Sequence, residues 1–132
     1  MPRFLSVAEV WAIHDDQIER YGGKLGCRDV AGLASAVAMP QSGYGDEYFH
    51  QDLFAMAAAY VYHIVASHPF VDGNKRTGMV VADTSTQLNG YEIPASAEDA
   101  FEAVVLAVAR GDIGKPEVAG FLRQHAVPLT DD

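Results

Sequence analysis

A single run of residues, from His68 to Arg76, gathers the side chains best suited to act on a phosphate ester; it reads His-Pro-Phe-Val-Asp-Gly-Asn-Lys-Arg. Gly73 permits a positive φ and therefore a turn. Asn74, Lys75 and Arg76 are then expected to form the first turn of a helix, where backbone N–H groups lack partners and attract anions. Lys75 and Arg76 add two positive charges, so the run predicts a phosphate site.

Two further side chains of the run supply the remaining chemistry. The carboxylate of Asp72 is the kind of oxygen ligand that Mg²⁺ takes together with substrate phosphates. The imidazole of His68, with an ordinary pKa of about 6.5, can accept the proton of an attacking hydroxyl near neutral pH. The prediction assigns His68 as catalytic base and Asp72 as metal ligand, with a phosphate and nucleotide site made by Gly73, Asn74, Lys75 and Arg76.

The helices that must position this run follow from apolar spacing and capping residues. Ser6 and Glu9 have the spacing of a capping box, which starts a helix that ends near Tyr21. A second helix should start after Asp29 and stop at Pro40. The other four are expected at about 52–67, 74–89, 96–110 and 116–125. Since 52–67 is apolar nearly all round, it should be the buried centre of an all-α bundle.

Length, charge and cysteine content narrow the classes of protein. The 132 residues fit one domain, 1–132. The net charge of -9 disfavours a nucleic-acid-binding surface and makes a nuclease a weak alternative. The longest apolar stretch, 53–66, is too short to span a membrane, and the N-terminus resembles no export signal. One cysteine, Cys27, allows no internal disulfide, so a reducing cytoplasm is the expected location.

The motif HPFVDGNKRTG resembles that of the Fic/Doc family, in particular its Doc (death-on-curing) branch. Three other stretches resemble it as well: HDDQIERYGG, DLFAMAAAYVYHIVASHPF and LNGY. The resemblance covers about residues 4–125 and implies the helical Fic fold, with the active-site loop at a helix N-terminus. It also implies a toxin that uses ATP and Mg²⁺ to modify a protein, for which elongation factor Tu is the expected target. A separate antitoxin would neutralise it, because the chain lacks the self-inhibiting motif of many Fic proteins.

Two positions depart from the Fic enzymes that transfer AMP. Those enzymes have a glycine where this chain has Lys75, and a second arginine where it has Met79. A lysine fills the space into which an α-phosphate would approach the backbone. The resemblance to Doc therefore implies transfer of the γ-phosphate, which makes the protein a Ser/Thr kinase. An AMP transferase and a catalytically silent anion-binding module remain as alternatives.

Several other polar and aromatic residues fall outside the predicted site. His14, His50 and His63 are interpreted as hydrogen-bonded histidines of the core. The polar run 83–86 is interpreted as a solvated helix face. The segment 41–50 reads as a loop whose aromatic residues, Tyr44, Tyr48 and Phe49, form either a flap that holds the target or a packed loop. No alternating stretch is long enough to predict a strand.

Overall fold

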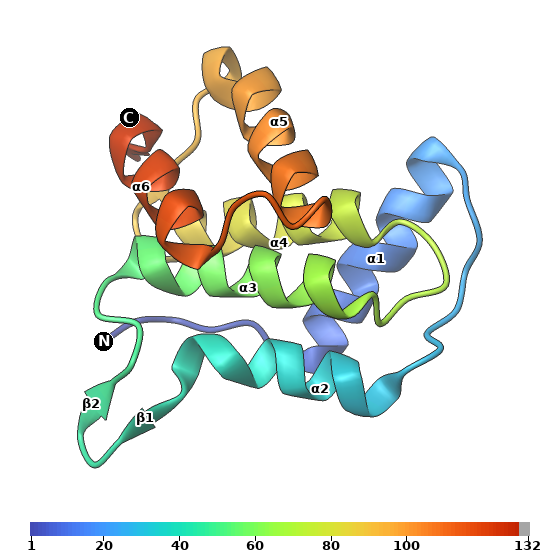
Figure 1. The fold of residues 1–132 in the computed structure, drawn as a ribbon, viewed down its shortest axis with the longest axis horizontal. Coiled ribbons are helices and arrows are strands. Elements are labelled where there is room, and N and C mark those ends of the chain that lie inside the picture. Colours follow the sequence, from blue (N-terminus) through green and yellow to red (C-terminus); the bar gives the residue numbers. More distant parts are fainter. Residues whose placement is uncertain (130–132) are drawn as a thin grey trace.

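The computed structural model describes residues 1–129, which form six α-helices with α3 at the centre (Figure 1). The helices are α1 (Val7–Tyr21), α2 (Val30–Ala38), α3 (Leu53–Ser67), α4 (Asn74–Leu88), α5 (Glu98–Ala109) and α6 (Lys115–His125). This confirms the predicted all-α fold and its helix boundaries to within a few residues. No helix in the described part of the chain is both long and apolar enough to cross a membrane.

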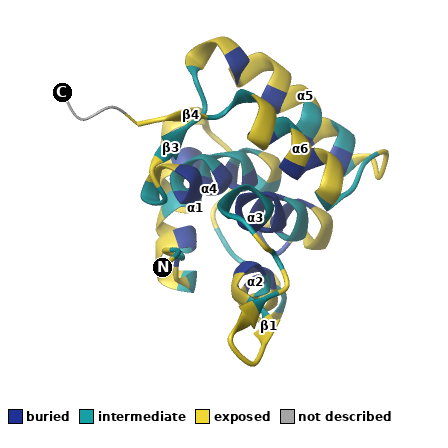
Figure 2. Cartoon of the chain, turned by 90° about the vertical axis from the view of Figure 1, so that its left-hand side faces the viewer, coloured by how far each residue is buried: buried dark blue, intermediate teal, exposed yellow. Residues whose placement is uncertain are grey.

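Helix α3 is central because it is apolar on almost every side. Eight of its residues are buried, and α2, α4, α5 and α6 all pack against it. Figure 2 views α3 nearly along its axis, and most of this helix has the dark blue of buried residues. Gly78 of α4 faces Val61 and Val65 of α3, where an added Cβ would lie only 3.0 Å from a Val65 methyl carbon. The glycine therefore lets α4 approach α3 closely.

The core has two parts, one on each side of α3. The α5–α6 side is formed by Ala57, Ala58, Val61, Val65, Ala82, Phe101, Val105, Val108, Val118, Ala119 and Leu122. The α1–α2 side is formed by Leu5, Val10, Leu33, Ala36, Val37, Tyr60, Ile64, Phe70 and Val81. Phe70 belongs to the predicted active-site run, so part of that run is anchored in the core.

The segment 41–50 is not a plain loop, and this corrects the prediction. The 3₁₀-helix η1 (Met39–Gln41) is followed by β1 (Gly43–Tyr44), which pairs antiparallel with β2 (Glu47–Tyr48). A second small sheet pairs β3 (Tyr91–Glu92) with β4 (Val127–Pro128), and the 3₁₀-helix η2 (Ala95–Ala97) precedes α5. Strands of two residues are too short to produce a detectable alternation, which is why the sequence did not reveal them.

The polar run 83–86 is also different from the prediction, because two of its four residues, Ser85 and Thr86, are buried. The hydroxyl of Thr86 donates to the Ala82 carbonyl at 2.8 Å, and that of Thr84 donates to the Val80 carbonyl at 2.8 Å. Bonds to the carbonyl four residues back satisfy hydroxyls within their own helix. A small polar side chain can therefore face the core without needing solvent.

Candidate active site

The first turn of α4 has no cap. Its N-cap residue is Gly73, at φ 76°, which has no side chain to accept a hydrogen bond. Within residues 1–129, no acceptor is found for the backbone N–H groups of Asn74, Lys75 and Arg76, and the first bond of the helix runs from Thr77 N to Gly73 O at 2.9 Å. Three donors without a protein acceptor at the positive end of a helix are suited to the anion site that the sequence predicts.

The two cations of this turn are used differently. Lys75 is exposed, and its ammonium has no hydrogen bond or ion pair among the described residues. Arg76 is partly buried; its Nη1 donates to the carbonyl oxygen of Gln17 at 3.2 Å, and its guanidinium lies 5.3 Å from the ring centre of Tyr21. Arg76 therefore ties α4 to the end of α1, while Lys75 is free to meet a ligand.

Asn74 also has a structural contact. Its Oδ1 accepts from the N–H of Phe70 and its Nδ2 donates to the carbonyl of Phe70, both at 2.9 Å. The side-chain amide of Asn74 thus replaces backbone partners that the turn lacks. Because the side chain of Asn74 is already bound, only its backbone N–H is left without a partner among the described residues and can contact a phosphate.

His68 has a strained backbone and a free imidazole. It is the C-cap of α3 at φ 48° and ψ 55°, and no other non-glycine residue in 1–129 has a positive φ. This left-handed conformation costs about 1–2 kcal/mol for a residue with a Cβ. The exposed imidazole makes no hydrogen bond within the described residues, whereas the carbonyl of His68 accepts from Arg28 Nε at 3.1 Å. Such strain is typical of functional positions.

The segment that follows α1 supports the loop from outside. The carbonyl of Pro69 accepts from the N–H groups of Arg28 and Asp29 at 2.9 and 3.1 Å, and Cys27 Sγ lies 3.4 Å from the same oxygen. The N–H of Val71 donates to the carbonyl of Gly26 at 3.0 Å. Cys27 is thus a neighbour of the loop 68–73.

The carboxylate of Asp72 is exposed yet fixed in orientation. Its Oδ1 accepts from the N–H of Gly73 at 2.9 Å, and its Oδ2 accepts from the N–H of Lys24 at 3.2 Å. Each oxygen retains a lone pair, so the carboxylate fits a hard cation such as Mg²⁺. No group of three or more acidic, His or Cys side chains that could hold a metal occurs in residues 1–129. A cation here would need a ligand's oxygens to complete its coordination.

All six predicted site residues line one open cavity of about 700 Å³, between the loop, α4 and α5. Met79 and Asp83 of α4 and Glu98 and Glu102 of α5 also line the cavity. Burial raises the pKa of Asp83 above its ordinary value. A volume of this size is typical of sites for small molecules of nucleotide size.

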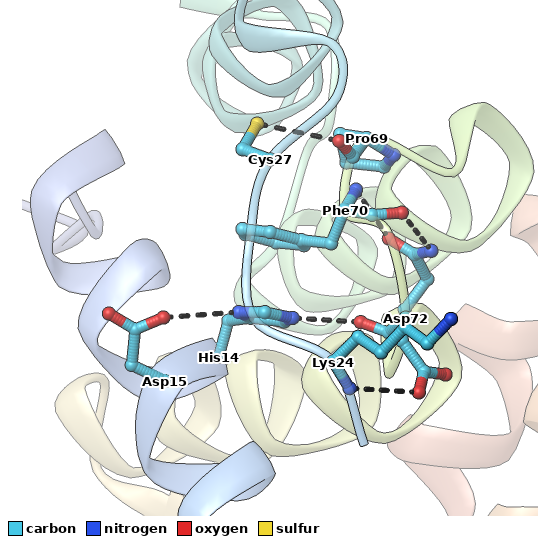
Figure 3. Close-up of polar contacts among 8 residues, drawn as sticks. His14, Asp15, Lys24, Cys27, Pro69, Phe70 and Asp72 are labelled. Carbon is cyan, nitrogen blue, oxygen red and sulfur yellow. Dashed lines mark hydrogen bonds and ion pairs between the residues drawn. The ribbon is translucent and has the colours of Figure 1, made fainter.

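The structure adds His14, which the sequence analysis placed in the core outside the site. It is fully buried, as predicted, but its Nε2 lies 2.8 Å from the carbonyl oxygen of Asp72 (Figure 3). The available signal was that a polar ring on the apolar face of α1 needs a buried partner. The sequence could not show that this partner is the active-site loop.

His63 and His50 do not line this cavity; both are hydrogen-bonded, as predicted, but they are half-buried and lie outside the core. The Nε2 atoms of His63 and His50 lie 3.1 and 3.3 Å from Nζ of Lys115, so both rings accept hydrogen bonds from the ammonium. Burial and the Lys115 charge lower the pKa of His63 to about 4, and lower that of His50 as well. This cluster connects α6 to α3.

The β1–β2 hairpin does not lie beside His68. It precedes the first residue of α3, whereas His68 follows the last (Figure 1). The 15 residues of α3 extend over about 22 Å. Tyr44 is 84% exposed, and the ring of Tyr48 packs against Phe4 at 5.6 Å. None of the three aromatic residues of the hairpin region lines the cavity, so they do not form a flap over it.

The sequence profile of the Fic/DOC family matches residues 4–85, which include the whole loop and the start of α4. The chain belongs to the Fic/DOC family. Among curated relatives, this Fic/DOC protein is 33% identical to "Protein kinase doc" of Escherichia phage P1 over 122 residues, covering 92% of this chain and 94% of the relative. It is 36% identical to "Toxin Doc" of Mycolicibacterium smegmatis over 107 residues, covering 76% and 82%.

Proposed function

We propose that this Fic/DOC protein is a Doc-type toxin that transfers the γ-phosphate of ATP to a Ser or Thr hydroxyl of a protein. The observation that carries the proposal is the uncapped first turn of α4, whose Lys75 has no partner within residues 1–129, in one cavity with His68 and Asp72. The curated relatives named "Protein kinase doc" and "Toxin Doc", both similar over most of the chain, support it.

The residues of the chain divide the reaction between them. The N–H groups of α4 and the Lys75 ammonium would bind the nucleotide phosphates and neutralise the charge that develops during transfer. Asp72 would hold Mg²⁺ together with phosphate oxygens. The cation, when bound, neutralises phosphate charge. Since positioning and charge neutralisation dominate phosphoryl transfer, few further groups are needed.

His68 would act as the base. The hydroxyl oxygen of the target forms a bond to the γ-phosphorus while the bond between that phosphorus and the β–γ bridging oxygen breaks, and ADP leaves. The hydroxyl proton passes to the free nitrogen of the His68 imidazole. A positioned base of this kind contributes about 100- to 10,000-fold in rate.

The proposed partners are a protein target, for which we infer elongation factor Tu, and a cognate antitoxin that blocks the site. We place the protein in the cytoplasm, where both ATP and such a target occur. We expect no direct contact with nucleic acid, because the net charge is -9.

The test is an incubation of the protein with elongation factor Tu, Mg²⁺ and ATP, followed by the intact mass of the factor. We expect a gain of one phosphate that is lost with the His68→Ala variant. A gain of AMP would instead support the alternative, an AMP transferase. An unchanged mass, together with growth arrest that persists in His68→Ala, would support a silent binding module.

The AMP-transfer alternative can be tested directly at Lys75. A glycine there would remove the ammonium and open the space beside the first turn of α4. If the protein is an AMP transferase, Lys75→Gly should preserve or increase activity. If it is a kinase, the same change should reduce phosphate transfer, because the free cation of the turn is lost.

A further inference from the structure

His14 contacts the active-site loop through a hydrogen bond whose direction is fixed. A carbonyl oxygen only accepts, so Nε2 of His14, 2.8 Å from the Asp72 carbonyl, must carry the proton. Nδ1 faces a carboxylate oxygen of Asp15 at 3.3 Å. The ring is fully buried, so the donor itself is shielded from water. If the donor is lost, the Asp72 carbonyl also loses its protein partner.

The same ring packs on the loop. The imidazole of His14 is stacked on the ring of Phe70, with centroids 3.8 Å apart and planes within 5° (Figure 3). Phe70 is fully buried, and its backbone is bound on both sides by the Asn74 amide. His14 therefore touches the loop at two residues, Phe70 and Asp72, that flank the exposed Val71.

The carboxylate of Asp72 depends on where this backbone lies. The Lys24 N–H reaches Oδ2 at 3.2 Å, and an added Cβ on Gly23 would stand 2.7 Å from the same oxygen. Space on that side is therefore tight, and a small shift of the Asp72 backbone would break this contact. The hydrogen bond from His14 holds the carbonyl of the residue, while the Lys24 and Gly23 segment holds its carboxylate.

We propose that His14 is a positioning residue that, through the Asp72 carbonyl, orients the Asp72 carboxylate to receive a divalent cation with the nucleotide. The inference rests on the proposed function. It adds a residue from α1, 58 positions away in the sequence, to the site. Groups that orient a metal ligand typically contribute about 10- to 100-fold to metal affinity.

Two substitutions separate the contacts of His14. His14→Phe keeps a flat ring on Phe70 and removes the donor, whereas His14→Gln keeps a side-chain N–H and removes the stacked ring. His125 is the matched control, because its Nδ1 lies 2.9 Å from the Phe121 carbonyl and its ring is stacked on Phe121 at 4.1 Å, in α6. His125→Phe removes the same kind of donor away from the site.

The first measurement is the affinity for ATP by calorimetry, with Mg²⁺ and without it. We expect His14→Phe to reduce the gain in affinity due to Mg²⁺ by about 10-fold or more, with little change in affinity without Mg²⁺. His14→Gln should restore most of that gain, and His125→Phe should leave it unchanged. A His14→Phe protein with the wild-type gain would overturn the inference.

The second measurement does not involve nucleotide. The surroundings of the Asp72 carboxylate can be followed by the amide NMR signals of Lys24 and Gly73, because the backbone N–H groups of both residues donate to this carboxylate. These signals should shift in His14→Phe, return toward wild type in His14→Gln and stay unchanged in His125→Phe. Unshifted signals in His14→Phe would overturn the inference. Failure of wild-type protein to bind ATP would overturn the proposed function instead, and these signals would still test His14.

Discussion

The N-termini of α3 and α4 differ in how their free N–H groups are satisfied. At α3, the Asp52 carboxylate accepts from the Ala55 N–H at 2.8 Å and from Arg123 Nη2 at 2.8 Å. At α4, Gly73 provides no cap, and three N–H groups have no acceptor within residues 1–129. Helix termini are satisfied by capping side chains, by water or by ligands. The uncapped start of α4, next to His68 and Asp72, is therefore available to the ligand that we propose.

The electrostatics of the two ends support the comparison. Although partial burial acts to raise it, the hydrogen bonds from the Ala55 N–H and the Arg123 guanidinium lower the pKa of Asp52. The negative charge of Asp52 at the start of α3 is therefore balanced by groups of the same chain, the Ala55 N–H and the Arg123 guanidinium. At the start of α4, the Lys75 ammonium is unpaired among the described residues. The partial positive charge of the helix N-terminus and the charge of Lys75 therefore both contribute to a positive potential there.

The largest expected effect is at His68, which precedes the uncapped end. His68→Gly should lower phosphate transfer about 100- to 10,000-fold, because the base is lost. The same change should raise the free energy of unfolding by about 0.5–1 kcal/mol, because glycine adopts φ 48° without strain. Activity is measured by the mass of the target and stability by urea denaturation.

His68→Asn is the matched variant for this prediction. Asparagine tolerates the left-handed region better than most residues with a Cβ, so stability should stay near wild type while transfer is lost. If either variant retained wild-type transfer, His68 would not be the base. A loss of stability in His68→Gly would show that the backbone at this residue is not strained.

A smaller effect is expected at Lys75. Lys75→Ala should weaken ATP binding about 10-fold, since one charge-assisted contact to phosphate is removed. The melting temperature should not change, because the ammonium has no partner in the described part of the protein. The control is Lys24→Ala, which removes an exposed lysine whose backbone N–H, rather than its side chain, contacts Asp72. Equal weakening by both variants would indicate a general charge effect.

At the capped end, the expected effect is on stability alone. Asp52→Ala should lower the free energy of unfolding by about 1 kcal/mol, as typical for loss of an N-cap, and the melting temperature by about 3–5 °C. Asp52→Asn keeps a capping oxygen and should recover most of this loss. Transfer activity should be unchanged in both. Reduced activity in Asp52→Ala at a temperature where it is folded would contradict the separation of the two helix ends.

The smallest effect concerns pH. His63 has a pKa of about 4 in the folded protein, below its ordinary 6.5. The unfolded chain therefore binds the proton more readily, and the contribution of this group is complete above pH 6.5 and is lost as the pH falls toward 4. Because His63 is partly solvated, we expect no more than about 1 kcal/mol.

His63→Gln should flatten the dependence of stability on pH between 6.5 and 4, as measured by urea denaturation at several pH values. The substitution should not remove the pH dependence entirely, because burial and the Lys115 charge lower the pKa of His50 as well. A slope identical to that of wild type would show that Lys115 and burial do not perturb His63. Transfer at pH 7 should be unaffected, since the cluster lies outside the cavity.

Much of the fold was predictable because its signals are local. The capping box of Ser6 and Glu9 and the stop at Gly22 define α1, and the all-round apolar pattern of 53–67 identifies the central helix. The β1–β2 hairpin was missed because two-residue strands leave no alternation. The burial of Ser85 and Thr86 was missed because a small polar side chain can face the core, as Thr86 does by donating to a carbonyl of its own helix, and the polarity of a residue does not reveal this.

The sequence by itself determined which groups the candidate site contains, because His68, Asp72 and the first turn of α4 are neighbours along the chain. Only the tertiary structure decided which of these groups are free. It assigned the Arg76 guanidinium to the end of α1 and the Asn74 amide to the Phe70 backbone, and it brought His14 to the Asp72 carbonyl. Local spacing fixes which groups are adjacent, but a hydrogen bond between residues 58 or 59 positions apart depends on how the helices pack.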